Sequence, residues 1–394
     1  MGSKAWRRDM KHNFDEPVVR RGTDCKKYLR YRSDVLPMWI ADTDFKAPQP
    51  IVDALTERMA EGVYGYPEVS EAFKQAVASW QAERFGWRVD ADACEFVPGV
   101  IPGIICAMRA LSHPGDNIAM LTPAYPPFMD MAMHNGRNIL RCPLKERDGR
   151  YDLDLDALEE ALSQERTRLF LLCNPHNPTG RVLTEEELRR IHALCARYHV
   201  VILSDEIHGD IVYAGHRHIP FASLGEAFSQ RCITFVNASK TFNVAGFRTA
   251  AFITENADLK ARVHEAVLDN KGIGENLCGT QATNTAYRHC AYYADELVAY
   301  LQGNLDAVCQ GLANTDRIRL IRPDGTYLLW LDCRRMNLPQ PELVRFFEEE
   351  ARLGLNDGST FGPEGVGFMR MNIGTQRALV REAMRRLTEA LSRH

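Results

Sequence analysis

Short apolar runs alternate with longer amphipathic stretches through the middle of the chain. The clearest apolar runs cover residues 169–173, 200–203 and 232–236. Runs of this length and composition are typical of strands buried on both faces of a sheet. The stretch 184–198 has the apolar spacing of a helix, and Thr184 followed by Glu187 forms a capping box at its start. This alternation predicts an α/β fold with a mainly parallel sheet that helices cover on both faces.

The two ends of the chain have different patterns from the middle. Residues 1–46 show little periodic structure, whereas a long helical pattern covers 291–312. Two short apolar runs and another amphipathic stretch follow, at residues 327–331, 341–353 and 367–371. This mixture predicts a separate α+β domain. The expected parts are an N-terminal segment joining the small domain (1–46), a large domain (47–290) and a small C-terminal domain (291–394).

Four polar segments lie at or next to the predicted strands. They are Asn174–Gly180 (NPHNPTG), Ser204–His208 (SDEIH), Ser239–Asn243 (SKTFN) and Gly367–Asn372 (GFMRMN). Taken singly, each has an ordinary structural reading: a turn, a structural acid, a solvated lysine and a strand with one wet face. However, Asn177, Asp205 and Lys240 are separated by 28 and 35 residues, and each interval fits one helix and one strand. Since ligands bind at the carboxyl ends of such strands, we expect these three side chains to converge there.

These residue types are the ones that pyridoxal 5′-phosphate (PLP) requires. A lysine bonds the aldehyde carbon of PLP and later moves protons. A carboxylate keeps the pyridine nitrogen protonated, so that the ring accepts electrons from the substrate carbon. An aromatic side chain stacks on the ring, and backbone N–H groups at a helix start bind the phosphate. An arginine grips the substrate carboxylate with two hydrogen bonds. The sequence therefore predicts a PLP enzyme in which Lys240 carries the cofactor.

The same four motifs together resemble those of the fold-type I PLP enzymes, the aspartate aminotransferase superfamily. Three further segments are similar to the MalY/PatB branch of cystathionine β-lyases. They are Arg21–Asp24 (RGTD), Leu36–Phe45 (LPMWIADTDF) and Gly62–Tyr66 (GVYGY). The similarity extends from about Asn13 to the C-terminus. It implies a large domain with a mainly parallel seven-stranded sheet, a smaller α+β domain, and a homodimer with its active sites at the interface.

The resemblance also implies a role for each candidate site residue. Lys240 would bond PLP, Asp205 would pair with the pyridine nitrogen, and Asn177 would donate to the phenolic oxygen. Tyr125 would stack on the ring, although a tyrosine beside a turn also fits an ordinary core position. Arg370 would bind the carboxylate of the amino acid substrate.

The remaining implied roles concern the phosphate group and the second subunit. The backbone amides of Val100 and Ile101 would bind the phosphate, and Ser239 would add a hydroxyl contact. Tyr66 would reach the phosphate across the dimer interface, and the loop 271–280 would also belong to that interface. A glycine-rich turn such as the one before Val100 is a weak signal on its own.

Two positions compare differently with related enzymes. His208 stands three residues after Asp205, where many aminotransferases have a tyrosine that also contacts the phenolic oxygen. Arg248 stands eight residues after Lys240, where many aminotransferases have a phosphate-binding arginine that members of the lyase branch often lack. We assign both residues to cofactor binding, and Arg248 leaves the choice between lyase and aminotransferase open.

The resemblance implies a carbon–sulfur β-lyase, which releases a thiol, pyruvate and ammonia from cystathionine or another S-substituted cysteine. An aminotransferase uses the same lysine, acid and arginine but protonates the cofactor carbon instead of expelling a leaving group. The geometry around the bound substrate decides between these routes, and a sequence does not show it. A regulatory or binding protein that keeps the fold, and another PLP reaction such as racemisation, are further alternatives.

Composition and charge narrow the expected setting. The net charge of −4 gives no electrostatic reason to expect nucleic acid. The longest apolar run, 97–111, contains two Pro, two Gly and one Arg, so we expect no membrane span. The N-terminus lacks the apolar segment of a signal peptide. The 11 Cys form no C-x-x-C pair, and Cys106, Cys173 and Cys195 are expected to be buried thiols of a cytoplasmic enzyme.

A metal site is the alternative reading of one stretch rich in acids and histidines. Its candidate ligands are Asp205, Glu206, His208, Asp210, His216 and His218. Their spacing matches no familiar zinc pattern, and Gly215 suggests that His216 and His218 lie in an exposed turn. The G-x-S-x-G motif of serine hydrolases is absent. Four basic residues are expected to be solvated charges: Lys26, Lys27, Arg334 and Arg335.

Overall fold

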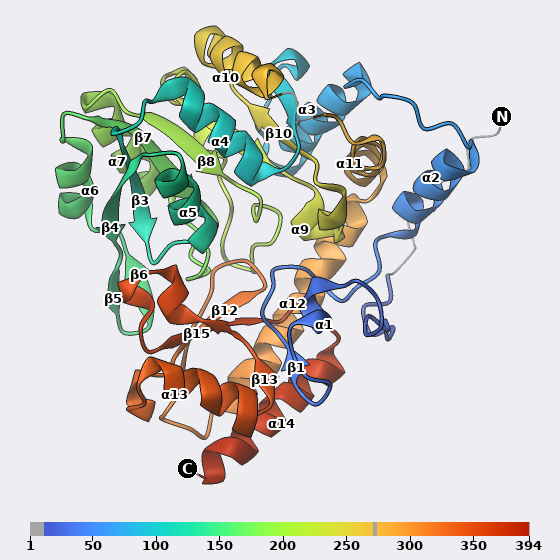
Figure 1. Ribbon diagram of the computed structural model, residues 1–394, viewed down its shortest axis with the longest axis vertical. Helices are drawn as coiled ribbons and strands as arrows, with labels where there is room; N and C mark the ends of the chain where they lie inside the picture. Colours follow the sequence, from blue (N-terminus) through green and yellow to red (C-terminus); the bar gives the residue numbers. More distant parts are fainter. Residues whose placement is uncertain (1–11, 271–273, 394) are drawn as a thin grey trace.

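The computed structural model describes residues 12–270 and 274–393, and its largest element is a seven-stranded sheet (Figure 1). In spatial order the strands are β2 (Cys94–Val97), β10 (Ala250–Ile253), β9 (Cys232–Val236), β8 (Val201–Asp205), β7 (Thr167–Cys173), β3 (Asn117–Thr122) and β4 (Asn138–Pro143). Strand β10 is antiparallel to both of its neighbours, and the other neighbouring strands pair in parallel. The predicted fold class and mainly parallel seven-stranded sheet are confirmed.

Helices cover both faces of this sheet, because side chains along each strand point alternately to opposite faces. In β7, Leu169 and Leu171 pack on one face, and Phe170 and Leu172 pack on the other. The first face is covered by α4 (Val100–Leu111), α5 (Pro126–His134) and α10 (Ala257–Asp269). The other face carries α3 (Glu71–Phe85), α6 (Leu155–Leu162) and α7 (Glu185–Arg197), with α11 (Leu277–His289) packed on α3.

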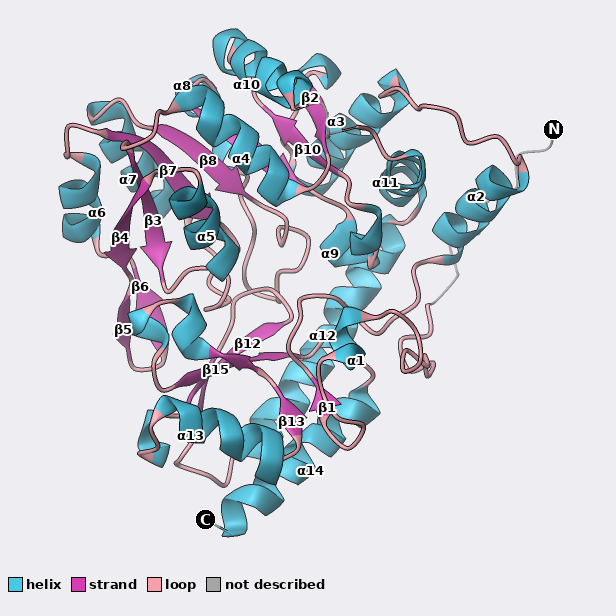
Figure 2. Ribbon diagram, viewed as in Figure 1, coloured by secondary structure: helices cyan, strands magenta, loops and turns pink. Residues whose placement is uncertain are grey.

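A second, antiparallel sheet is built from the C-terminal part of the chain (Figure 2). Its strands, in order, are β11 (Arg319–Ile321), β12 (Leu328–Asp332), β15 (Phe368–Asn372) and β14 (Asn356–Asp357). Helices α12 (Ala291–Leu312) and α14 (Arg377–Arg393) pack on each other beside it. The N-terminal segment reaches the same region, where β1 (Leu36–Pro37) pairs in parallel with β13 (Leu353–Gly354). The domain boundary at residue 290, between α11 and α12, stays a prediction.

Shorter elements connect these layers. They are α1 (Lys26–Leu29), α2 (Gln49–Ala60), β5 (Lys145–Arg147), β6 (Arg150–Asp152), α8 (Glu226–Ser229), α9 (Ser239–Phe242) and α13 (Gln340–Arg345). Thr184 and Glu187 form the predicted capping box at the start of α7. The stretch predicted as one helix over 341–353 is divided instead, because a π-helical turn (Phe346–Glu350) follows α13 and the chain then enters β13.

Two expectations about the surface are wrong. Lys27 is fully buried rather than solvated, because the carboxylate of Asp44 accepts from its amine at 2.6 Å. His218 is buried as well, and its Nε2 lies 2.9 Å from a carboxylate oxygen of Glu206. The other three basic residues of that set, and His216, are exposed as expected. A sequence shows a charge but not the tertiary partner that makes its burial tolerable.

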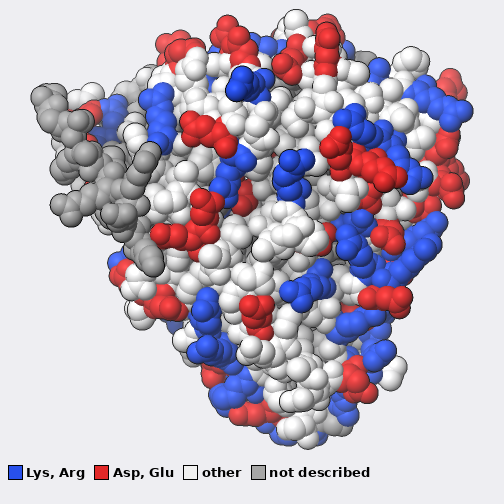
Figure 3. Space-filling view, turned by 180° about the vertical axis from the view of Figure 1, so that it is seen from behind, with Lys and Arg blue, Asp and Glu red and all other residues white. Residues whose placement is uncertain are grey.

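The surface carries charges of both signs. Figure 3 shows basic and acidic side chains interspersed over most of one face. None of the helices in the described ranges is long and apolar enough to cross a membrane.

Candidate active site

Lys240 lies on α9, the single helical turn that follows β9. Asp210 fixes this turn from behind, since its carboxylate accepts from Thr241 Oγ1 at 2.8 Å and from Trp80 Nε1 at 3.0 Å. Asn243 ends the turn in the left-handed conformation. On the other side, the amine of Lys240 donates to the backbone oxygen of Ala41 at 2.7 Å. The lysine is therefore held at both its backbone and its amine.

A cavity of about 510 Å³ surrounds this amine at the carboxyl ends of β7, β8 and β9. Most of the residues predicted for the site line it. They are Val100, Ile101, Tyr125, Asn177, Asp205, His208, Ser239, Lys240 and Arg248. Their functional roles stay predictions, but the structure places them around one space, as expected for groups that follow neighbouring parallel strands.

Asp205 ends β8 and is buried at the cavity wall. Its Oδ1 accepts from the backbone N–H of Ile207 at 3.2 Å. Burial raises the pKa of Asp205 to about 7, and the Ile207 bond and the nearby amine of Lys240 act against that rise. A carboxyl in this position is driven to ionise by a cation placed against it, such as a protonated ring nitrogen.

Lys240 has a shifted pKa for a related reason. Burial, and then the positive charge of Arg370, lower the pKa of its amine to about 8, while Asp42 and Asp205 act in the opposite direction. A substantial fraction of the amine is therefore neutral near physiological pH. A neutral amine is the form that attacks a carbonyl carbon and accepts a proton.

Arg370 lies on β15 behind Asn177, and its partners are all neutral. Its Nη1 donates to Asn177 Oδ1 at 3.0 Å, and its Nη2 donates to Trp39 O at 2.8 Å and to Asn356 Oδ1 at 2.7 Å. The Nε is buried and has no hydrogen-bond partner among the described residues. Burial lowers the pKa of this side chain to about 10, with Tyr125 and Tyr327 opposing the change.

The side chain of Arg370 is only 2% exposed, and within the described part of the chain no carboxylate is paired with it. A buried guanidinium in this state has lost its hydration without gaining a counter-charge, which is costly. Such a residue is suited to bind a carboxylate that a ligand brings.

The amide of Asn177 is oriented by Arg370. Because a guanidinium only donates, Asn177 turns its oxygen towards Arg370 and leaves its N–H groups for the cavity that it lines. The loop that carries it is fixed by Asn174, whose Oδ1 accepts from Leu183 N at 3.0 Å. Asn177 is therefore a donor towards the cavity, as its predicted role requires.

His208 follows β8 and is a neutral group in the cavity wall. It is 2% exposed, and its buried Nδ1 has no hydrogen-bond partner in the part of the chain that the structure describes. Burial, together with the charges of Lys240 and Arg370, holds the pKa of His208 well below its usual value. Its ring meets the ring of Tyr327 edge-on at 6.1 Å. His208 therefore presents an uncharged imidazole in the cavity wall, with a ring nitrogen that could hydrogen-bond a ligand.

Helix α4 begins at the cavity, and the N–H groups of its first turn, including those of Val100 and Ile101, have no acceptor within the helix. Gly99 precedes them with φ of 119°, which residues with a side chain rarely adopt. A Cβ at Gly103 would lie 2.9 Å from Val97 and 3.0 Å from Phe235, so glycine lets the helix pack closely on the sheet. This helix start is suited to bind an anionic group.

Two of the predicted cofactor-binding residues are exposed. Arg248 lines the cavity but is exposed to solvent, with a left-handed φ of 44°. Tyr66 lies outside the cavity and is 107% exposed. Its contact with a phosphate in a second subunit therefore stays a prediction. Of the loop 271–280, residues 271–273 lie outside the described residues.

Other residues of the cavity were not among the predicted site residues. The backbone oxygen of Ala41 comes from a segment 199 residues away from Lys240 in the chain. Asn237, whose Oδ1 accepts from Ser239 N, also lines the cavity. Phe128 closes the apolar side, and the apolar face of the helix after Tyr125 is the signal that identifies it.

The histidines and acids considered as metal ligands are engaged elsewhere. Glu206 pairs with His218, Asp210 accepts from Thr241, and His216 Nε2 lies 3.3 Å from Asp324. Across residues 12–270 and 274–393, no three His, Cys, Asp or Glu side chains gather in a way that could hold a metal ion.

The donors and acceptors of the cavity fit PLP. Asp205 provides a buried acid for a ring cation, Asn177 provides an N–H donor, and Lys240 provides a partly neutral amine. Tyr125 supplies an aromatic surface, and the first turn of α4 supplies the anion site. Behind Asn177, Arg370 has no carboxylate partner in the described residues and adds a place for the carboxylate of an amino acid.

Comparison with known proteins agrees with this geometry. The family model for class I and II aminotransferases matches residues 36–387. Cystathionine β-lyase PatB of Bacillus subtilis is 38% identical over 388 residues, which cover 96% of this chain and 100% of that protein. Protein MalY of Escherichia coli is 30% identical over 387 residues, covering 96% and 98%.

The crystal structure of cystalysin from Treponema denticola, which contains a PLP cofactor, is similar with a TM-score of 0.94 and 29% identity. The alignment covers 98% of this chain and 100% of that one. The chain therefore belongs to the class I and II aminotransferase family, in the branch that contains PatB and MalY.

Proposed function

We propose that this protein is a PLP-dependent carbon–sulfur β-lyase that acts on cystathionine or a related S-substituted cysteine. The observation that carries the proposal is the buried Arg370, which has no carboxylate partner in the described residues and lies beside Asn177 and Lys240. This arrangement provides for a substrate with an α-carboxylate next to a reactive amine. The choice of a lyase is supported by the 38% identity to a cystathionine β-lyase over almost the whole chain.

Each end of the cavity would hold one part of PLP. Asp205 would pair with the ring nitrogen, Asn177 would donate to the phenolic oxygen, and Tyr125 would stack on the ring. The amides of Val100 and Ile101 would bind the phosphate. Ser239, Arg248 and, from a second copy of the chain, Tyr66 would complete the phosphate site, while His208 would contact the cofactor as a neutral ring.

In the reaction, bound PLP supplies an electron-accepting ring conjugated to the substrate nitrogen. Arg370 would hold the substrate carboxylate with two parallel hydrogen bonds and so orient the Cα–H bond towards Lys240. The amine of Lys240 would take the proton from Cα and then donate a proton to the sulfur that leaves from Cβ. The residual three-carbon product takes up water and yields pyruvate and ammonia, so that one substrate and one water give three products.

Arg248, which lines the cavity, favours a second candidate, an aminotransferase, because many aminotransferases have a phosphate-binding arginine at this spacing from the lysine. The two activities differ in the fate of the proton that Lys240 removes. A lyase delivers it to the leaving sulfur, whereas an aminotransferase delivers it to a carbon of the cofactor. An amino acid without a leaving group therefore separates them.

The test is to incubate the purified protein with PLP and cystathionine and to measure free thiol and pyruvate in parallel. We expect both products in equal amounts from the wild-type protein and neither from Lys240→Ala. Alanine is the matched substrate without a leaving group, and a lyase does not convert bound PLP to its amino form with it. If no S-substituted cysteine releases a thiol, and alanine rapidly converts bound PLP to its amino form, the protein is an aminotransferase instead.

We further propose a cytoplasmic homodimer. All 11 Cys are free, and Cys106, Cys173 and Cys195 are buried, as suits a reducing compartment. Near Tyr66, Val63 and Tyr64 are also exposed, at 72% and 59%. An apolar segment of this kind is suited to be covered by a second copy of the chain, and it supports the prediction that Tyr66 completes the partner's site. Sedimentation at several protein concentrations measures the oligomeric state and tests the proposed homodimer.

A further inference from the structure

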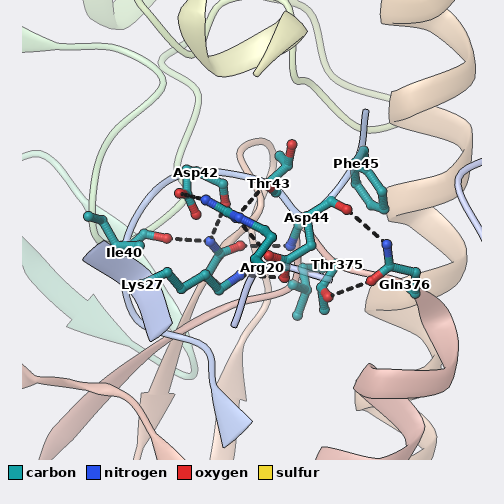
Figure 4. Close-up of polar contacts among 12 residues, drawn as sticks. Arg20, Lys27, Ile40, Asp42, Thr43, Asp44, Phe45, Thr375 and Gln376 are labelled. Carbon is teal, nitrogen blue, oxygen red and sulfur yellow. Dashed lines mark hydrogen bonds and ion pairs between the residues drawn. The ribbon is translucent and has the colours of Figure 1, made fainter. Parts of the chain in front are cut away.

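Two cations and two carboxylates form a network within the N-terminal segment (Figure 4). Lys27 Nζ donates to Asp44 Oδ2 at 2.6 Å, and Arg20 donates to Asp44 Oδ1 at 2.7 Å through Nη1. Through Nη2, Arg20 also donates to Asp42 Oδ2 at 2.7 Å. Lys27 and Asp44 are 0% and 3% exposed, so this pair is shielded from water and salt. The charges of the four side chains balance.

The two carboxylates lie at one end of a backbone segment that we call the strap, residues Trp39–Asp42. The strap supplies carbonyl groups to the active site. Trp39 O accepts from Arg370 at 2.8 Å, and Ala41 O accepts from the amine of Lys240 at 2.7 Å. Ala41 O also accepts from the hydroxyl of Tyr327 at 3.3 Å. The two basic side chains to which the proposed reaction assigns a role, Lys240 and Arg370, are therefore both bound to the same short stretch of backbone.

The strap is also fastened to the small-domain sheet. Asn372, which follows Arg370 on β15 by two residues, donates to Ile40 O and to Asp42 O. Asp44, which comes just after the strap, is held in the same way. Its backbone oxygen accepts from Gln376 at 2.8 Å, and its backbone N–H donates to Gly374 O at 2.8 Å. The fully buried Lys27 lies on the opposite side, so the position of Asp44 is determined from both directions.

Arg20 and Lys27 precede the part of the chain that the family model matches, which begins at residue 36. We propose that the network of Arg20, Lys27, Asp42 and Asp44 is a positioning device for the reaction, which holds the strap so that its carbonyls orient the Lys240 amine and the Arg370 guanidinium. This inference rests on the proposed use of Lys240 as the PLP-binding amine. It does not depend on which substrate is cleaved.

The network also balances a charge near Lys240. The groups that act on this amine are Asp205 from β8, Arg370 from β15 and Asp42 from the strap, together with the neutral ring of His208 and the hydroxyl of Tyr327. Asp42 raises the pKa of the amine, and Arg20 compensates part of the charge of Asp42. Removal of Arg20 therefore raises the pKa of Lys240, and removal of the Asp42 charge lowers it.

The test compares three variants of the full chain. Arg20→Gln removes the cation, Arg20→Lys keeps the charge without the two-pronged geometry, and Arg319→Gln is the matched control. Arg319 also bridges two carboxylates, Glu146 at 2.8 Å and Asp332 at 3.0 Å, but it does not line the cavity. Two quantities are measured: the rate at which PLP-free protein captures PLP, and the pH midpoint of the visible absorption of the lysine-bound cofactor.

We expect Arg20→Gln to capture PLP about tenfold more slowly than wild type, the factor that matches the loss of one ordinary hydrogen bond. Its absorption midpoint rises by about 0.5–1 pH unit, as expected for one charge at a distance in a partly screened setting. In Arg20→Lys, which keeps the positive charge, the absorption midpoint lies close to the wild-type value. Arg319→Gln leaves both quantities at wild-type values even where its melting temperature falls.

The inference is overturned if the absorption midpoint is the same in Arg20→Gln, Arg319→Gln and wild type. Arg20 would then contribute only to the stability of the fold. If Arg20→Gln does not fold, Asp42→Asn decides the question, because its midpoint must move down rather than up. A wild-type protein that captures no PLP refutes the proposed function instead, so the two failures are distinguishable.

Discussion

Asp205→Asn should stabilise the PLP-free protein while destroying its activity. The carboxyl of Asp205 is buried, and its pKa is raised from 3.8 to about 7. Below pH 3.8 this carboxyl is protonated in both the folded and the unfolded state, so it does not change the free energy of unfolding. As the pH rises from 3.8 to 7, only the unfolded state releases the proton, and the folded state therefore loses stability. Asparagine has no charge to desolvate, and its oxygen still accepts from Ile207 N.

The size of the effect follows from the shift. About 3 pH units at 1.36 kcal/mol each give about 4 kcal/mol as an upper limit for the full penalty. As the pH rises from 5 to 7, the unfolding free energy of the variant minus that of wild type should increase by about 2–3 kcal/mol. Urea titrations of both PLP-free proteins at several pH values measure this difference.

Addition of PLP supplies the control. Paired with a ring cation, the ionised Asp205 is no longer penalised, so PLP should stabilise the wild-type protein more than the variant. Turnover of Asp205→Asn should fall by at least ~100-fold, taking ~3 kcal/mol for one buried charge-assisted bond. A variant that is no more stable than wild type at pH 7, or whose stability difference does not change with pH, contradicts this account of Asp205.

Three further changes test other parts of the site. Lys240→Ala should abolish the visible absorption of lysine-bound PLP and nearly all turnover, because one amine is both anchor and base; a retained band counts against the assignment. Arg370→Lys keeps the charge but loses one of two parallel bonds to the substrate carboxylate, so kcat/KM should fall roughly 10–150-fold at ~1.5–3 kcal/mol, and an unchanged value removes Arg370 from the substrate site. His208→Gln should leave the shape of the pH profile of kcat/KM between pH 6 and 8 unchanged, because the pKa of His208 lies well below its usual value and the ring stays neutral there; loss of one limb of the profile shows that His208 titrates.

The convergence of Asn177, Asp205 and Lys240 was accessible from sequence because each follows a strand of one parallel sheet. Strand ends are set by local apolar runs, and the direction of parallel strands places their carboxyl ends at one edge. The capping box of α7 was accessible for the same local reason, since Thr184 and Glu187 are three residues apart.

The buried state of Lys27 was not accessible, because it depends on Asp44 and on the fold that brings the two together. Likewise, the strap acts through carbonyl groups, which every residue possesses and which leave no trace in residue types. Arg370 was identified as a substrate-binding residue only through resemblance. Its lack of a carboxylate partner in the described residues, which gives the assignment a physical basis, is a property of the folded chain.

The most direct test of the central claim is to locate the covalent bond to PLP. Purified protein is incubated with PLP, reduced with borohydride, digested and analysed by mass spectrometry. We expect the pyridoxyl label on Lys240 alone, and we expect Asp205→Asn to form the same label. A label distributed over exposed lysines, or none on the peptide that contains Lys240, would contradict that claim.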